Sequence, residues 1–152
     1  MLSRLMNPPL SSVIVGTWQL ESRTDRTQSG EHRIEPSLGD DPIALLYYDA
    51  AGHFAAQFMK RHREERGADA VRAGSNNTRA IGGYDAYFGT YTVDDRTGTV
   101  TQTLVGALGP ENVGHVVSRE MHVTDGRLTI VLETSAPDGE RLTRTLIWKR
   151  VG

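Results

Sequence analysis

Hydrophobic and polar positions alternate along this chain in short runs that end at turn residues. The clearest run covers residues 84–93, where aromatic and β-branched side chains suit a half-buried strand. A polar turn at residues 94–98 ends this run, and a second alternating run at residues 99–107 follows at once. The two runs predict an antiparallel hairpin, and we expect it to begin a continuous meander that extends to the end of the chain.

The same pattern predicts eight strands in all, at residues 13–23, 43–49, 53–60, 84–93, 99–107, 115–124, 127–134 and 140–151. Short turns separate several of them, including the hairpin signal Asp125-Gly126. Residues 24–41 are polar and predict a long irregular connection with a short edge strand near Arg33. Residues 61–83 interrupt the pattern and predict a short helical or flexible flap. Strands at this spacing without interleaved helices are typical of an antiparallel barrel or sandwich.

The composition limits the classes of function. A chain of 152 residues suffices for one core, and we expect a flexible arm at residues 1–10 followed by a single domain at residues 11–152. The net charge is −2 and only residues 60–66 form a basic run, so no nucleic-acid partner is expected. The sequence has no cysteine, no metal-ligand spacing of histidines and no cofactor motif, which indicates no disulfide, metal or cofactor. Without a signal peptide or a membrane-spanning run, the expected location is the cytoplasm, with no membrane partner.

Several segments together resemble a known family. They are Gly-Thr-Trp at 16–18, the stretches at 48–59 and 86–94, Asp-Gly-Arg-Leu-Thr-Ile at 125–130 and the closing Leu-Ile-Trp-Lys-Arg at 146–150. The pattern is similar to the small microbial lipocalin-like domain family and extends from Gly16 to Val151. The resemblance implies an all-β, eight-stranded antiparallel up-and-down barrel with one apolar cavity, used in related barrels to carry ligands or to act as a cyclase or isomerase. The chain departs from the family at Gln102 and Thr103, where many members carry histidine.

Extending the alternation through each strand places polar side chains among the aliphatic residues of the predicted interior. No aspartate or glutamate is expected on the same inward faces, so a buried arginine there needs a carbonyl group or a ligand anion as its partner. An arginine beside tyrosine hydroxyl groups is a suitable receptor for a carboxylate, phenolate or enolate. The polar residues expected inside are Tyr87, Tyr91, Gln102, His115, Arg119 and Arg144.

Each of these residues also has a purely structural interpretation. The family resemblance implies that Arg144 stacks over Trp18 and closes one end of the barrel, through a cation–π contact. A strand bulge would turn Arg119 outward. His115 lies next to a loop, where a solvated strand-end position is common, and the tyrosines could be ordinary core residues.

Two functions from different classes are consistent with this interior. The first is binding of a small, mostly hydrophobic molecule that bears a carboxylate, phenolate or carbonyl group, by Trp18, Tyr87, Tyr91, Gln102, His115, Arg119 and Arg144. The alternative is a cyclase or isomerase that templates a polyketide-like or other natural-product intermediate and polarises its carbonyl group. In that alternative Tyr91 and His115 are the acid/base candidates and Arg119 stabilises the developing charge. A barrel packed shut for protein interaction, and a homodimer formed through an exposed edge, stay open.

Overall fold

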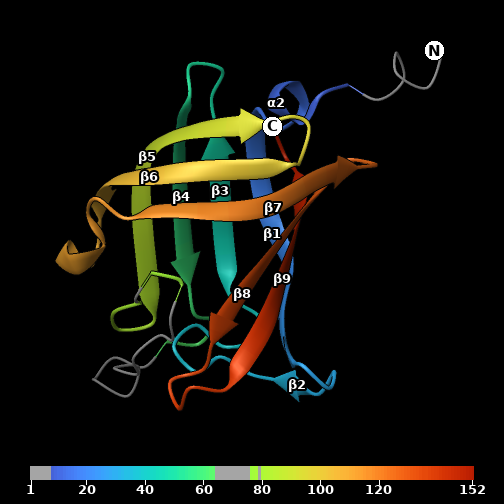
Figure 1. Ribbon diagram of the computed structural model, residues 1–152. Coiled ribbons are helices and arrows are strands. Elements are labelled where there is room, and N and C mark those ends of the chain that lie inside the picture. The colour runs from blue at the N-terminus through green and yellow to red at the C-terminus, as the bar shows by residue number, and fades with distance from the viewer. Residues whose placement is uncertain (1–7, 64–75, 79) are drawn as a thin grey trace.

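The alternating pattern folds into antiparallel strands that close into a barrel (Figure 1). The computed structural model describes residues 8–63, 76–78 and 80–152. Neighbouring strands in the sheet are antiparallel, and the last strand returns to pair with the first. The strands in the described part of the chain are β1 (Gly16–Thr27), β2 (His32–Arg33), β3 (Ile43–Tyr48), β4 (His53–Met59), β5 (Tyr84–Asp94), β6 (Thr99–Ala107), β7 (Val116–Thr124), β8 (Arg127–Ser135) and β9 (Arg141–Arg150).

The predicted eight-stranded up-and-down barrel is confirmed, although its first strand begins and ends later than expected. Residues 10–13 form the short helix α2 (Leu10–Val13), and β1 continues to Thr27. The expected edge strand near Arg33 is β2, which pairs with the end of β1 outside the barrel wall. A single 3₁₀ turn, η1 (Pro110–Asn112), connects β6 to β7. The arm predicted at residues 1–10 and the flap predicted at 61–83 lie largely outside the described residues.

The helices of the described chain are short. None of them is both long enough and apolar enough to cross a membrane.

A bulge in β1 changes which of its side chains face the interior. The register of β1 against β9 shifts between Leu20 and Ser22. Trp18 is buried before the shift, whereas Arg23 and Asp25 are the buried positions after it. An extra residue reverses the two-residue alternation of a strand from that point on. The bulge therefore turns two charged side chains inward that an unbroken alternation would have left outside.

Trp18 closes the end of the barrel that lies beside α2. Its ring is fully buried, and its indole Nε1 donates a hydrogen bond to the carbonyl oxygen of Ile14 at 2.9 Å. The guanidinium carbon of Arg150 lies 4.3 Å from the centre of the ring. The expectation that Arg144 stacks over Trp18 is therefore wrong, because the register between β1 and β9 sets Arg150 opposite Trp18.

Candidate functional site

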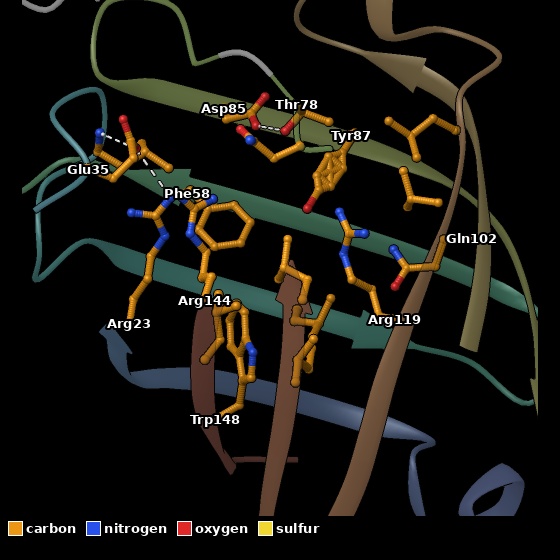
Figure 2. Close-up of a pocket in the computed structure, with 18 of the residues that line it drawn as sticks. Arg23, Glu35, Phe58, Thr78, Asp85, Tyr87, Gln102, Arg119, Arg144 and Trp148 are labelled. Carbon is orange, nitrogen blue, oxygen red and sulfur yellow. Dashed lines mark hydrogen bonds and ion pairs between the residues drawn. The ribbon is translucent and has the colours of Figure 1, made fainter. Parts of the chain in front are cut away.

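A cavity of about 80 Å³ lies inside the barrel, toward the end away from α2 (Figure 2). Apolar side chains such as Leu46, Leu104 and Ile130 form much of its wall. The loop after β2 and residues 77–78, which precede β5, border it on one side. The charged and hydrogen-bonding side chains that also line it are Arg23, Glu35, Ser37, Tyr48, Asn77, Thr78, Asp85, Tyr87, Gln102, Arg119, Arg144 and Trp148.

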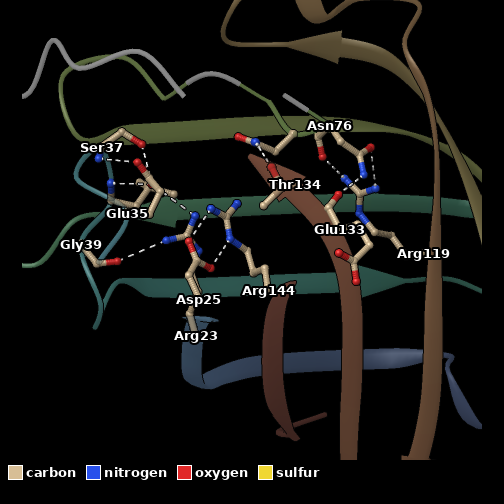
Figure 3. Close-up of polar contacts among 12 residues, drawn as sticks. Arg23, Asp25, Glu35, Ser37, Gly39, Asn76, Arg119, Glu133, Thr134 and Arg144 are labelled. Atoms are coloured by element: carbon tan, nitrogen blue, oxygen red, sulfur yellow. Dashed lines mark hydrogen bonds and ion pairs between the residues drawn. The ribbon is translucent and has the colours of Figure 1, made fainter. Parts of the chain in front are cut away.

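Arg144 is held by an ion pair with a carboxylate from β1. Its Nε and Nη2 atoms donate to the two oxygens of Asp25 at 2.8 and 3.0 Å (Figure 3). Both residues are almost completely buried, at 4% and 2% exposed. The inward direction predicted for Arg144 is confirmed, but the expectation that no acidic residue faces inward is wrong, because the bulge in β1 turns Asp25 inside. The guanidinium group of Arg144 is thus already neutralised within the barrel.

A second ion pair at the cavity mouth joins Arg23 to Glu35. The Nη2 atom of Arg23 lies 3.2 Å from Glu35 Oε1, and its Nη1 atom donates to the carbonyl oxygen of Gly39. Burial acts to raise the pKa of Glu35, but Arg23 and hydrogen bonds from Ser37 outweigh it, so the pKa is lowered. Burial and the neighbouring Arg144 lower the pKa of Arg23 to about 10. The sequence did not predict this pair, because Glu35 lies in an irregular loop, where period-two alternation does not indicate which side chains point inward.

Arg119 lines the cavity without an acidic partner among the described residues. Its guanidinium donates to the backbone oxygen and the side-chain oxygen of Asn76, at 3.0 and 3.3 Å, and to the carbonyl oxygen of Ser118 at 3.1 Å (Figure 3). Burial lowers the pKa of Arg119, whereas the nearby hydroxyl groups of Tyr87 and Tyr48 act to raise it. The inward direction predicted for Arg119 is confirmed, and its positive charge meets only neutral acceptors in the part of the chain that the structure describes.

Asp85 is a second charged residue of the cavity that forms no ion pair with the described residues. It lies near the start of β5, is 3% exposed and lines the cavity. The hydroxyl group of Thr78 donates to its Oδ2, whereas its Oδ1 has no hydrogen-bond partner among the residues described. Burial raises the pKa of Asp85, and the Thr78 hydroxyl and the Ala86 backbone N–H oppose this shift only partly. Sequence reasoning missed Asp85, although it precedes Tyr87 by two residues and so shares its face.

Two further donors line the cavity. Figure 2 shows the hydroxyl group of Tyr87 pointing toward the guanidinium of Arg119. Burial, with a contribution from Asp85, raises the pKa of Tyr87, which therefore stays protonated and able to donate. The indole Nε1 of Trp148 is buried and has no hydrogen-bond partner in the described chain. A polar group of a ligand could accept a hydrogen bond from this indole N–H, which no described residue uses.

Gln102 reaches the same cavity but is engaged with its wall. The hydroxyl group of Tyr48 donates to Gln102 Oε1 at 2.9 Å, and both side chains are buried. Burial raises the pKa of Tyr48 well above its ordinary value. This hydrogen bond fixes the direction of the Gln102 amide, whose acceptor is then already used.

Three residues of the predicted site lie outside the cavity. Trp18 closes the far end of the barrel. Tyr91 donates its hydroxyl to the carbonyl oxygen of Asp49 at 2.6 Å and packs edge-on against Tyr48. His115 is exposed in the turn before β7, so its predicted inward direction is wrong; the strand begins only at Val116. The cavity thus brings together Tyr87, Gln102, Arg119 and Arg144.

No group of three or more histidine, aspartate or glutamate side chains in the described ranges is arranged to hold a metal ion. The polar groups that line the cavity are guanidinium, carboxylate, hydroxyl, amide and indole groups.

Comparison with known proteins identifies a family model that the chain matches. Residues 15–151 match the family model described as a lipocalin-like domain. No curated protein matches the chain.

Proposed function

Because the chain belongs to the lipocalin-like domain family, whose model covers residues 15–151, we propose that its barrel binds a small, mostly hydrophobic molecule bearing a carboxylate, phenolate or carbonyl group. The observation that carries this proposal is Arg119, a guanidinium group on the cavity wall with no carboxylate partner among the described residues. A ligand oxyanion would supply the charge-assisted hydrogen bonds that neutral carbonyl groups supply only weakly.

The other arginines of the cavity are less suitable as anion receptors. Arg144 is bonded through two nitrogen atoms to Asp25, and Arg23 is paired with Glu35. An anion at either site would have to compete with a buried carboxylate. Arg119 only has to exchange its contacts with Asn76 for contacts with the ligand.

The remaining groups fit the same ligand. The Tyr87 hydroxyl and the Trp148 indole N–H are donors next to an apolar wall, which suits a molecule with one polar end and a hydrophobic body. The cavity of about 80 Å³ has about half the volume of the 150 Å³ dry cavity that accommodates benzene. A ligand of ring size therefore has to displace side chains at the mouth.

The two tryptophans of the chain give a direct test of occupancy by NMR. The indole N–H of Trp148 lines the cavity without a partner, whereas that of Trp18 is bonded to Ile14 at the closed end. Titration with phenylacetate and a panel of small aromatic and aliphatic carboxylates should shift the Trp148 indole signal and leave the Trp18 signal in place. A shift of the Trp18 signal alone, or of neither signal with any acid, would contradict the proposal.

Arg119→Leu tests the anion receptor. A bound acid at a hundredfold excess over its Kd should stabilise the wild-type protein by about 2.7 kcal/mol. Arg119→Leu should lose this stabilisation, whereas Arg96→Leu should keep it, because Arg96 is 90% exposed in the turn after β5. Equal stabilisation of Arg119→Leu and wild type in thermal-shift and calorimetric titrations would remove the main support for the proposal.

The cyclase or isomerase alternative receives support from a different residue than the sequence suggested. Tyr91 and His115, its acid/base candidates, lie outside the cavity, whereas Asp85 lines it, with one oxygen that has no hydrogen-bond partner among the described residues. This observation supports the alternative with Asp85, in place of Tyr91 and His115, as its acid/base group.

A further inference from the structure

The buried carboxylate of Asp85 lowers the stability of the folded protein. This residue is 3% exposed, and Oδ1 has no hydrogen-bond partner in the described chain. No arginine or lysine of the described chain forms an ion pair with it. A buried acid in this state destabilises the folded protein, and a buried unsatisfied acid that lines a cavity is a candidate functional group.

The surroundings of Asp85 supply what a proton-transfer site needs. Asp85 and Tyr87 lie two residues apart on the inner face of β5, with the side chain of Asp85 nearer the cavity mouth. The Tyr87 hydroxyl points toward the Arg119 guanidinium, which comes from β7 (Figure 2). The same cavity is thus lined by a carboxylate, one oxygen of which has no hydrogen-bond partner among the described residues, and by a neutral and a cationic donor, Tyr87 and Arg119.

We propose that Asp85 is the acid/base group of a proton-transfer activity in this cavity, acting on a carbonyl compound with an acidic C–H bond next to the carbonyl group. This inference rests on the proposed function, because Arg119 and Tyr87 hold the carbonyl oxygen of the same ligand. The Asp85 carboxylate removes the proton, and the electron pair of the C–H bond moves through the carbonyl group to its oxygen. The resulting enolate accepts hydrogen bonds from Arg119 and Tyr87.

The reverse transfer completes the reaction. Protonated Asp85 returns its proton to a carbon atom of the enolate, either the original one or one conjugated with it. The second choice moves a double bond, so substrate and product are isomers. Electrons and protons balance within the substrate and one carboxyl group, and no oxidant, reductant or further reactant is consumed.

The charged and polar groups around Asp85 set its behaviour as a base. Burial and Glu111 favour the neutral acid, while the Thr78 hydroxyl, the Ala86 N–H and Arg23 favour the carboxylate. The net effect is a raised pKa for Asp85. A carboxylate whose pKa is closer to the working pH is a stronger base than a solvated one and is still ionised there.

Hydrogen–deuterium exchange measures this activity directly. Phenylacetone and a panel of small aryl and alkyl methyl ketones, matched to the acids above, are incubated with the protein in D₂O. Loss of the proton signals next to the carbonyl group is then followed by ¹H NMR. The wild-type protein should accelerate exchange over buffer, and Asp85→Asn should reduce the rate by about 10²-fold or more, or to that of buffer. Binding, read from the Trp148 indole signal, should be the same in both proteins.

Thr78→Val provides a second variant that keeps the carboxylate. It removes the hydroxyl group that bonds Oδ2, and loss of a hydrogen bond to the charged form raises a carboxyl pKa further. The pH at which exchange is half-maximal should therefore move upward relative to wild type. A merely structural role for Asp85 would not produce this shift. If Asp85→Asn does not fold, the pH profile of Thr78→Val tests the role of Asp85 on its own.

The outcomes separate this inference from the proposed function. If the acids and ketones bind through Arg119 but no ketone exchanges faster than in buffer, Asp85 is not an acid/base group, and the binding function stands. If exchange in Asp85→Asn equals that of the wild type, or if Thr78→Val leaves the pH profile unchanged, the inference is likewise overturned. If no acid or ketone binds, the binding function fails, and the activity that rests on it fails too.

Discussion

Replacing Arg144 with methionine should destabilise the barrel strongly, and replacing Asp25 with leucine as well should restore most of the loss. Arg144 and Asp25 are 4% and 2% exposed, and two hydrogen bonds of 2.8 and 3.0 Å join them. Methionine fills much of the volume of the arginine side chain but leaves the Asp25 carboxylate buried without its paired cation and without both hydrogen bonds from Arg144. The double variant leaves an apolar pair of similar volume.

The size of the effect follows from the burial of the pair. Removing one partner of a buried ion pair costs about 3–5 kcal/mol, whereas replacing both partners with packed apolar residues is often neutral or stabilising. A single domain is typically stable by about 5–15 kcal/mol, so the single substitution removes a large share of the total. At about 2–4 °C per kcal/mol for a chain of this size, the melting temperature should fall by about 6–20 °C.

Urea unfolding followed by far-UV circular dichroism measures these differences for wild type, both single variants and the double variant. The coupling energy of the double-mutant cycle isolates the interaction of Arg144 with Asp25. A cost below about 1 kcal/mol for Arg144→Met, or a double variant as unstable as that single variant, would refute the reasoning. The double variant should still bind phenylacetate, because the proposed anion receptor is Arg119.

Two further predictions concern stability. Burial raises the pKa of Asp85, so folding favours its protonated form, and the destabilisation it causes is present above the folded pKa and disappears as the pH falls below the ordinary value of about 3.9. Asp85→Asn should therefore be more stable than wild type at pH 7 and lose this advantage toward pH 3 in urea titrations, and a pH-independent difference would contradict this. Gly89→Ala should destabilise the barrel by about 3 kcal/mol, the upper end of the usual cost of overpacking, because its Cβ would lie 1.8 Å from the carbonyl oxygen of Thr103; an unchanged urea midpoint would contradict that contact.

The sequence was sufficient to predict the inner faces of β5 to β9. Tight turns connect most of these strands, and period-two alternation along each strand gives the facing directly. Gln102, Arg119 and Arg144 accordingly face the interior as predicted. His115 is the exception, since the turn after η1 extends one residue further than the pattern indicated and the strand starts at Val116.

The partners of the buried arginines could not be predicted in the same way. Asp25 faces inward only because β1 has a bulge between Leu20 and Ser22, and nothing in the local pattern marks that extra residue. Glu35 comes from an irregular loop, where the backbone has no fixed period. Asp25 meets Arg144 only where β1 pairs with β9, so that pairing depends on the closure of the barrel. Glu35 reaches Arg23 through the path of the loop after β2 and not through strand alternation.

Asp85 is a different case, because its facing could have been read from the sequence. It stands two residues before Tyr87 on a strand whose alternation was clear. What the sequence could not show is its state: the Thr78 hydroxyl that binds one oxygen comes from outside the strand, and the other oxygen is left without a partner. The unused bonding capacity that makes it a candidate group is a property of the folded cavity.

The distribution of charges in the cavity favours a site over a closed core. The barrel neutralises Arg144 with Asp25 and Arg23 with Glu35, which shows that its architecture can bring carboxylates to buried arginines. Arg119 and Asp85 line the same cavity, yet no ion pair joins them, and neither forms an ion pair with another described residue. A core selected for stability alone would gain by pairing these two groups or by replacing them with apolar residues. Under the proposed function, Arg119 and Asp85 act from the wall of one cavity on the same bound molecule.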